Sequence, residues 1–285
     1  MIEKIVTKSV VASALLAALT IAPSFAAAKT KTALIIDHNC TAIDKVPAEY
    51  IEKAKKTFKV AYGHTSHGSQ IVSGMQALRD DKPSLFTFGR SKDGLFFLDK
   101  TPKGDLGNPD RTTWAERTRD LLKDSKWDCN LIIWSWCGQV SKASEQNIQT
   151  YLDLMNGLEK EFPLVTFVYM TGHLDGSGKN GNLNQRNDQI RAFCKANNKV
   201  LFDFADIESY DPDGKVNYME LNARDTCDYK DGRITKNWAV EWLNNNPEHK
   251  FALPAKAAHS KPLNAALKGQ AFWWMLARLC DWKGI

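Results

Sequence analysis

The 285-residue sequence lacks several patterns that would identify a function directly. It has no Cys-x-x-Cys pair and no His-Glu-x-x-His motif, so a zinc ribbon, a thioredoxin-type site and a helical zinc-hydrolase motif are not indicated. The formal net charge is only +5 and no basic tract is present, which argues against nucleic-acid binding. Beyond the N-terminus, no apolar run is long enough to span a bilayer.

The first residues are typical of a secretory signal peptide. Lys4 and Lys8 accompany an apolar core over residues 10–21, and small residues suited to cleavage follow it. We therefore predict a signal peptide at 1–28, a single domain at 29–285, and a periplasmic or secreted location. Export makes disulfide bonds possible among the six cysteines, but the sequence does not choose among the pairings.

Apolar runs that read as buried strands alternate with segments of helical periodicity. The main runs are 58–62, 130–134, 164–170 and 199–204. Strands that are apolar throughout are typical of a parallel sheet covered by helices on both faces. We therefore predict an α/β three-layer domain with a mostly parallel sheet. The Gly- and Pro-rich segment 80–110 and the segment 209–258 are predicted to be loop insertions.

Polar residues follow these predicted strands. Ligands bind beyond the carboxyl ends of the strands in such sheets, where these loops converge. The converging residues are His64, Ser66, His67, Gln139, His173, Asp175 and Asp206. The sequence therefore predicts an active site at this edge of the sheet.

The most informative stretch is 62–70, Tyr-Gly-His-Thr-Ser-His-Gly-Ser-Gln. It joins a predicted strand to a predicted helix, and a Gly-flanked turn in this position exposes a side chain for chemistry. We interpret Ser66 as a nucleophile. The alternative is a surface turn whose histidines only cap or pack.

The order of motifs resembles the SGNH/GDSL hydrolase superfamily, in a divergent form. Ser66 lies nearest the position of that superfamily's nucleophilic serine, and Gly107 is similar to its oxyanion-binding glycine. Gln139 stands where an asparagine is usual, and His259 precedes the C-terminal helix as the superfamily's catalytic histidine does. The resemblance implies a flavodoxin-like fold and Ser–His acyl transfer.

One position departs from the superfamily pattern. The acid that usually lies three residues before the histidine is replaced by Lys256. Asp225 or Asp228 could supply the acid instead, or the site could work as a Ser–His dyad. In either case His259 is expected to deprotonate Ser66, while Gly107 and Gln139 stabilise the oxyanion.

The resemblance, the predicted export and the tryptophan-rich loops together favour an esterase that removes acyl groups, such as acetyl, from a carbohydrate or polysaccharide. The residues expected to contact the substrate are His64, His67, His173, Asp175 and Trp136. No cofactor and no metal are predicted. The partner is expected to be a small-molecule or polysaccharide substrate, and the sequence does not indicate an oligomeric state.

Two other functions remain open at this point. His64, His67 and His173 could serve a polysaccharide lyase or a metal-dependent hydrolase, because zinc accepts a mixed set of nitrogen and oxygen ligands. A glycan-binding protein without catalytic activity, built on a hydrolase-like fold, is the third reading. The absence of an acid at position 256 favours it.

Overall fold

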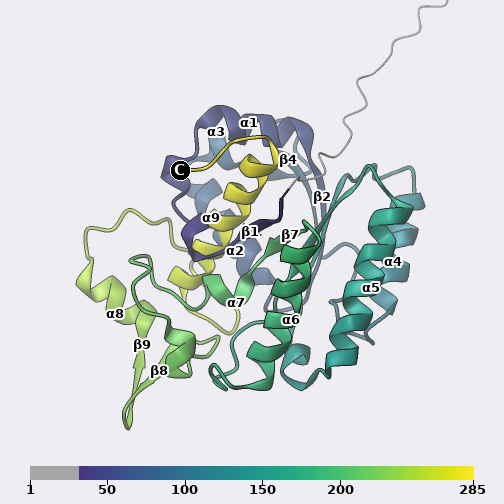
Figure 1. Ribbon diagram of the computed structural model, residues 1–285. Coiled ribbons are helices and arrows are strands. Elements are labelled where there is room, and N and C mark those ends of the chain that lie inside the picture. Colours follow the sequence, from purple (N-terminus) through teal and green to yellow (C-terminus); the bar gives the residue numbers. More distant parts are fainter. Residues whose placement is uncertain (1–31) are drawn as a thin grey trace, which may run out of the picture.

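A seven-stranded sheet forms the centre of the computed structural model, which describes residues 32–285 (Figure 1). The predicted signal peptide lies outside the described residues. Every neighbouring pair of strands in this sheet is parallel. The strands are β1 (Leu34–Ile36), β2 (Lys59–Gly63), β3 (Phe88–Gly89), β4 (Leu95–Asp99), β5 (Leu131–Trp134), β6 (Thr166–Met170) and β7 (Val200–Phe202).

Helices cover both faces of the sheet, which confirms the predicted three-layer α/β fold. One face carries α1 (Ala48–Thr57), α2 (Ser69–Asp81), α3 (Pro83–Phe86), α7 (Phe204–Ile207) and α9 (Pro262–Leu279). The other carries α4 (Thr113–Lys123), α5 (Glu145–Glu161) and α6 (Asn182–Ala196). Successive strand residues alternate between the two faces: Val60 and Tyr62 belong to the first core and Ala61 to the second.

The strand order is β1-β7-β6-β5-β2-β4-β3. Strand β2 pairs with β4 on one side and with β5 on the other. The chain therefore progresses in opposite directions from β2, toward β4 and toward β5, β6 and β7, as in flavodoxin-like sheets. Loops that follow adjacent strands diverge at such a switch point and leave a crevice for ligands.

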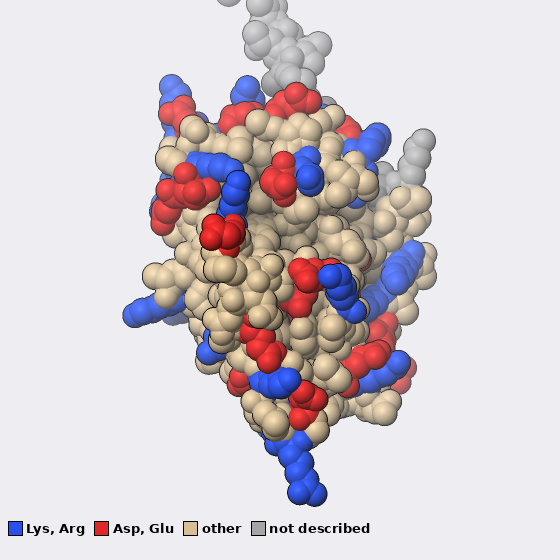
Figure 2. Space-filling model, turned by 90° about the vertical axis from the view of Figure 1, so that its left-hand side faces the viewer, with Lys and Arg blue, Asp and Glu red and all other residues tan. Residues whose placement is uncertain are grey.

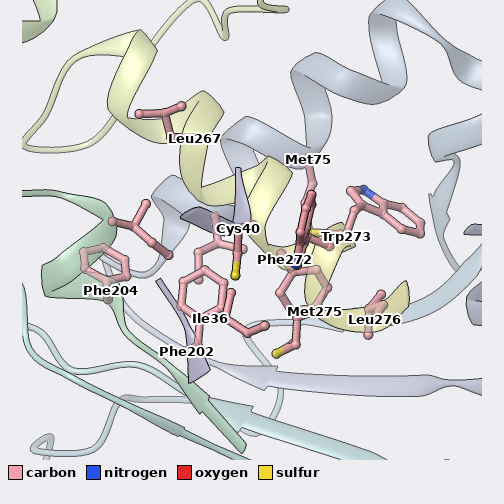
Figure 3. Packing of buried hydrophobic residues seen from close by; sticks show 14 of the residues in the cluster. Ile36, Cys40, Met75, Phe202, Phe204, Leu267, Phe272, Trp273, Met275 and Leu276 are labelled. Atoms are coloured by element: carbon pink, nitrogen blue, oxygen red, sulfur yellow. The ribbon is translucent and has the colours of Figure 1, made fainter. Parts of the chain in front are cut away.

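Helices α2 and α9 cross very closely. A Cβ atom on Gly74 would lie 2.0 Å from the Ala265 carbonyl oxygen, and one on Gly269 would lie 2.3 Å from the Gly74 carbonyl carbon. Beyond this crossing, α9 buries Phe272 against Phe97 of β4 and Trp273 against Phe86 of α3. Figure 3 shows both side chains among the buried residues of α9. Backbone contact at the crossing anchors α9, the helix that follows the predicted catalytic histidine.

The segment 80–110 is not a loop insertion, and this prediction is wrong. It contains α3, β3 and β4, and β4 lies in the sheet between β2 and the edge strand β3. Leu95, Phe97 and Leu98 are buried there. A strand of five residues between Gly- and Pro-rich turns offers too short a pattern to be recognised as a central element.

The segment 209–258 lies outside the central sheet. It holds an antiparallel hairpin of β8 (Asp228–Asp231) and β9 (Ile234–Asn237), followed by α8 (Trp238–Asn245). Short 3-10 helices complete the fold: η1 (His38–Cys40), η2 (Ile43–Lys45), η3 (Gly138–Lys142) and η4 (Tyr218–Leu221). No helix in residues 32–285 is long and apolar enough to cross a membrane.

All six cysteines are free thiols in the structure, so it contains none of the disulfide bonds that export would make possible. Cys40, Cys227 and Cys280 belong to the core on one face of the sheet, and Cys129 and Cys194 to the core on the other. Each of these five is buried among apolar side chains, as Figure 3 shows for Cys40. The sixth, Cys137, is only half-buried.

Acidic and basic side chains are interspersed over the face of the molecule shown in Figure 2, without a large area of one sign. This distribution agrees with the mixed charge pattern of the sequence.

Candidate active site

A thiol, an imidazole and a carboxylate form a hydrogen-bonded chain at the carboxyl edge of the sheet. His67 Nδ1 lies 3.1 Å from Cys137 Sγ, and His67 Nε2 donates to Asp225 Oδ2 at 2.9 Å. His67 lies in the turn after β2, and Cys137 lies after β5. These are the adjacent strands at the switch point, where the fold leaves room for a ligand.

The pairing of β2 with β5 brings the two loops together. Gly63 is in register with Trp134, and the Ser135 N–H donates to the Gly63 carbonyl oxygen at 3.0 Å. The turn after β2 then lies directly against the chain after β5. A Cβ atom on Gly68 would be 2.3 Å from Ser135 Oγ, so this close approach requires glycine.

Asp225 reaches the site from the segment outside the sheet. Its N–H donates to the Leu174 carbonyl oxygen at 3.1 Å, which ties the segment to the loop after β6. Its Oδ1 atom accepts from the Thr226 N–H at 2.9 Å, which leaves Oδ2 directed at His67. The carboxylate is therefore held by backbone contacts on both sides.

The hydrogen bonds favour a charged thiolate–imidazolium pair. The hydrogen bond from His67 and a weaker one from Ser66 together lower the pKa of Cys137 to about 7, against the opposing effect of partial burial. Burial alone would lower the pKa of His67, but the bonds to Asp225 and Cys137 raise it to about 9. Burial alone would raise the pKa of Asp225, but its bond to His67, the neighbouring His173 and the Thr226 N–H together lower it. Between about pH 7 and pH 9, the thiol is thus ionised beside a protonated imidazole.

His67 lies between two other histidine rings. Its ring stacks on His173 with centroids 3.8 Å apart and an interplanar angle of 2°. It also stacks on His259, at 4.3 Å and 9°. Burial is the main cause that lowers the pKa of His173, which favours its neutral form. The two flanking rings restrict His67 to the plane that contains both Cys137 and Asp225.

The structure brings the predicted nucleophile Ser66 into this site but does not pair it with His259. Ser66 is exposed, and its Oγ lies 3.7 Å from Cys137 Sγ. The His259 ring is engaged by stacking on His67. The histidine that lies in this site is therefore His67, and the group facing its Nδ1 is the Cys137 thiol rather than the Ser66 hydroxyl.

Gly107 and Gln139 lie near the site, but their predicted oxyanion donors already have partners. Both the Gly107 N–H (2.9 Å) and Gln139 Nε2 (3.1 Å) donate to Asp105 Oδ1. Gln139 Oε1 accepts the Cys137 N–H at 2.8 Å. Asp105 Oδ2 accepts from Thr65 Oγ1 at 2.5 Å. Both predicted oxyanion donors are therefore engaged by the buried Asp105 carboxylate, which joins the loop after β2 to the loop after β5.

His64 is a structural residue rather than a substrate contact. It is buried, its Nε2 donates to Asp99 Oδ1 at 2.7 Å, and its Nδ1 lies 2.8 Å from the Thr65 carbonyl oxygen. Both ring nitrogens are therefore occupied, which corrects the predicted role.

Trp136 and Asp175 also have local structural partners. Trp136 is 3% exposed, and its Nε1 donates to the Met170 carbonyl oxygen at 3.0 Å, so its ring is not offered to a substrate. Asp175 Oδ1 accepts from the Ser177 N–H at 2.9 Å and from its hydroxyl at 2.5 Å, in a tight turn. These contacts give both residues a local structural role, and their predicted contacts with a substrate stay predictions.

The predicted metal-binding cluster of His64, His67 and His173 does not form, because His64 points to Asp99. Ligand atoms of His67, His173 and Asp225 do lie within 4.8 Å of one another. However, the two imidazole rings are parallel, so their in-plane lone pairs run side by side. They do not converge on one ion at the roughly 2.0–2.1 Å that zinc requires. This arrangement suits proton transfer better than metal binding.

Sequence reasoning missed Cys137 as a reactive group and assigned Asp225 only as one possible acid. A signal for Cys137 is present in hindsight, since it follows the apolar strand adjacent to β2, as Ser66 follows β2. No family model, curated protein or solved structure matches this chain. The geometry of the site is therefore the basis for assigning its chemistry.

Proposed function

We propose that this protein is a cysteine-dependent hydrolase that cleaves acyl bonds through a covalent thioester. The observation that carries the proposal is the chain from Cys137 Sγ through His67 to Asp225 Oδ2, at 3.1 and 2.9 Å. A nucleophile, a base and a group that orients the base are the three parts that covalent acyl transfer needs.

The residues have distinct roles in this reaction. The Cys137 thiolate attacks the acyl carbonyl carbon, and the His67 imidazolium then protonates the leaving oxygen or nitrogen. The neutral His67 next takes a proton from water, which attacks the thioester and releases the acid and the thiol. Asp225 accepts from His67 Nε2 throughout, so that Nδ1 stays directed at the sulfur.

This proposal keeps the reaction class that the SGNH resemblance implies and replaces serine by cysteine as nucleophile. An ester of a carbohydrate or polysaccharide remains the proposed substrate, on the strength of the predicted export. Ser66 lies on the open side of the site, 3.7 Å from the sulfur, where it meets the same substrate. A test must therefore distinguish the two nucleophiles.

The test is to incubate the protein with p-nitrophenyl acetate, quench with acid and locate the acetyl group by peptide mass mapping. We expect an acetyl thioester on Cys137 that does not form in His67→Ala. Cys137→Ala should lose turnover, whereas Cys129→Ala, which removes a buried thiol far from His67, should retain it. Turnover that persists in Cys137→Ala, with a fluorophosphonate adduct on Ser66, would establish a serine enzyme instead.

The other two functions predict different results in the same assay. A metal-dependent hydrolase or lyase should lose activity with a chelator and leave no acetyl group on Cys137. A glycan-binding protein should bind oligosaccharides and show no turnover, with binding unchanged in Cys137→Ala.

A further inference from the structure

Ser66 presents a hydroxyl group to the reactive sulfur without being part of the proton-transfer chain. In the part of the chain that the structure describes, the hydrogen-bond partner of its Oγ is Cys137 Sγ, at 3.7 Å. The side chain is exposed, so a substrate that reaches the sulfur also reaches this hydroxyl.

Several of the other polar groups around Cys137 are already engaged. The Cys137 N–H donates to Gln139 Oε1, and the Gly107 N–H and Gln139 Nε2 both donate to Asp105. The Thr65 hydroxyl proton is donated to Asp105 Oδ2. The buried Ser135 Oγ and His173 Nε2 also lack a hydrogen-bond partner among the described residues. Of these groups, the Ser66 hydroxyl is the one that is exposed and lies against the sulfur, so it is free to follow a change in charge there.

We propose that Ser66 is a catalytic oxyanion donor rather than a nucleophile. This inference rests on the proposed function and assigns one further residue to it. In the free protein the Ser66 hydroxyl donates to the thiolate, and in the tetrahedral intermediate it donates to the acyl oxygen. A donor that meets charge where it develops lowers the barrier to acyl transfer.

The step balances without any covalent change at Ser66. The thiolate electron pair forms the S–C bond, and the carbonyl π pair moves to the oxygen, which becomes the oxyanion. When the intermediate collapses, that pair re-forms the carbonyl and the bond to the leaving group breaks. The His67 proton goes to the leaving group, and the Ser66 proton stays on its own oxygen.

The backbone holds Ser66 while its side chain can turn. The Ser66 carbonyl oxygen accepts from Ser69 Oγ at 2.6 Å and from the Ser69 N–H at 3.2 Å, at the start of α2. The position of Cβ is thereby set. Rotation about the Cα–Cβ bond is then enough to turn the hydroxyl from the sulfur toward the acyl oxygen. That oxygen is bonded to the carbon that the sulfur has attacked.

Two reactions of Cys137 separate an oxyanion donor from other roles. Acetylation by p-nitrophenyl acetate passes through an oxyanion, whereas alkylation by iodoacetamide displaces iodide at a saturated carbon and does not. Both rates are measured well above the thiol pKa of about 7, so that ionisation of the sulfur does not limit either rate.

We expect Ser66→Ala to slow acetylation by about 10²–10³-fold and to change alkylation little. Ser66→Thr, which keeps a hydroxyl, should restore most of the acetylation rate. Ser73→Ala, which removes a hydroxyl one turn further along α2, is the matched control and should behave like the unmodified protein.

Other outcomes overturn the inference in recognisable ways. Equal losses in both reactions would show that Ser66 only supports the sulfur, and no loss in acetylation would show that it is dispensable. A fluorophosphonate adduct on Ser66 would make it a nucleophile. If no acetyl group forms on Cys137 in the unmodified protein, the proposed function itself fails, and this inference falls with it.

Discussion

The Cys137–His67 pair should make one thiol reactive at neutral pH. The thiolate is the species that reacts with iodoacetamide, and the bond from His67 lowers the pKa of Cys137 from 9.0 to about 7. The alkylation rate should therefore rise with pH, reach half its maximum near pH 7 and level off above it. Peptide mass mapping after timed quenching gives the rate for each cysteine.

Replacing His67 by alanine removes the main cause of the lowered pKa. The midpoint for Cys137 should then move up, toward the ordinary thiol value of 9.0. His249→Ala, which alters a histidine that packs on Trp242 and Phe251, is the control and should leave the midpoint unchanged. A midpoint that stays near 7 in His67→Ala would contradict the proposed ion pair.

A second charged pair lies fully buried behind the site. Lys268 Nζ of α9 donates to Glu208 Oε1 at 3.0 Å and to the Gln70 side chain, and both charged residues are 0% exposed. Glu208 Oε2 also accepts the Leu174 N–H at 2.9 Å, next to His173. The pair therefore ties α9 to the loop that carries a stacked histidine.

Removing one partner of this pair leaves the other charge buried without compensation. Lys268→Met should lower the free energy of unfolding by about 3–5 kcal/mol. Lys179→Met breaks an exposed pair with Glu220 and should cost at most about 1 kcal/mol. Urea denaturation measures both values. A similar small loss in both variants would show that the buried pair contributes no more than a surface one.

The close backbone packing of α2 against α9 can be tested by a substitution at Gly74. Alanine at Gly74 places a methyl group 2.0 Å from the Ala265 carbonyl oxygen, a backbone atom that cannot move aside without shifting α9. We expect Gly74→Ala to lower the free energy of unfolding by about 1–3 kcal/mol or more. The matched control is Gly157→Ala in α5, where a Cβ atom meets nothing within 4 Å.

The control should change stability in the opposite direction. Alanine at an unobstructed helical position restricts the unfolded chain and typically stabilises a protein by about 0.4–1 kcal/mol. Thermal unfolding of the two variants should therefore move their midpoints apart. A destabilisation of the same size at both positions would contradict close backbone packing at Gly74.

At the same scale, apolar patterns were sufficient to predict most elements of the fold. Strands β2, β5, β6 and β7 and helices α2, α4, α5 and α9 lie where the periodicity indicates, because each is buried on a continuous face. The apolar run of β4 is not predicted to belong to the sheet, because its five residues lie among glycines and prolines, where local propensity favours loops. Its place beside β2 depends on a pairing that only the folded chain reveals.

Over the whole molecule, the approach of His67 to Cys137 can be predicted from the sequence, whereas the approach of Asp225 cannot. His67 and Cys137 follow strands whose pairing can be expected from an α/β sheet, so their loops converge by topology. Asp225 lies 158 residues from His67, in a segment outside the central sheet. Its approach depends on the bond between its N–H and the Leu174 carbonyl oxygen, and no local pattern encodes that contact.

The segment outside the central sheet should affect the reaction of Cys137 through the Asp225 carboxylate alone. Asp225→Asn replaces a carboxylate acceptor by an amide that does not stabilise the imidazolium. Acetylation of Cys137 should slow by about 10²–10⁴-fold, and the midpoint of its alkylation should rise in pH because the pKa of His67 falls.

Asp228→Asn is the matched control for this prediction. Asp228 lies three residues further on, and its carboxylate accepts from Thr226 and Asn237 within the segment rather than from His67. Both variants remove one negative charge from the same region, so a general effect of charge would appear in both. A loss confined to Asp225→Asn would show that the segment contributes one oriented carboxylate to the site. Equal losses would mean that it supports the fold instead.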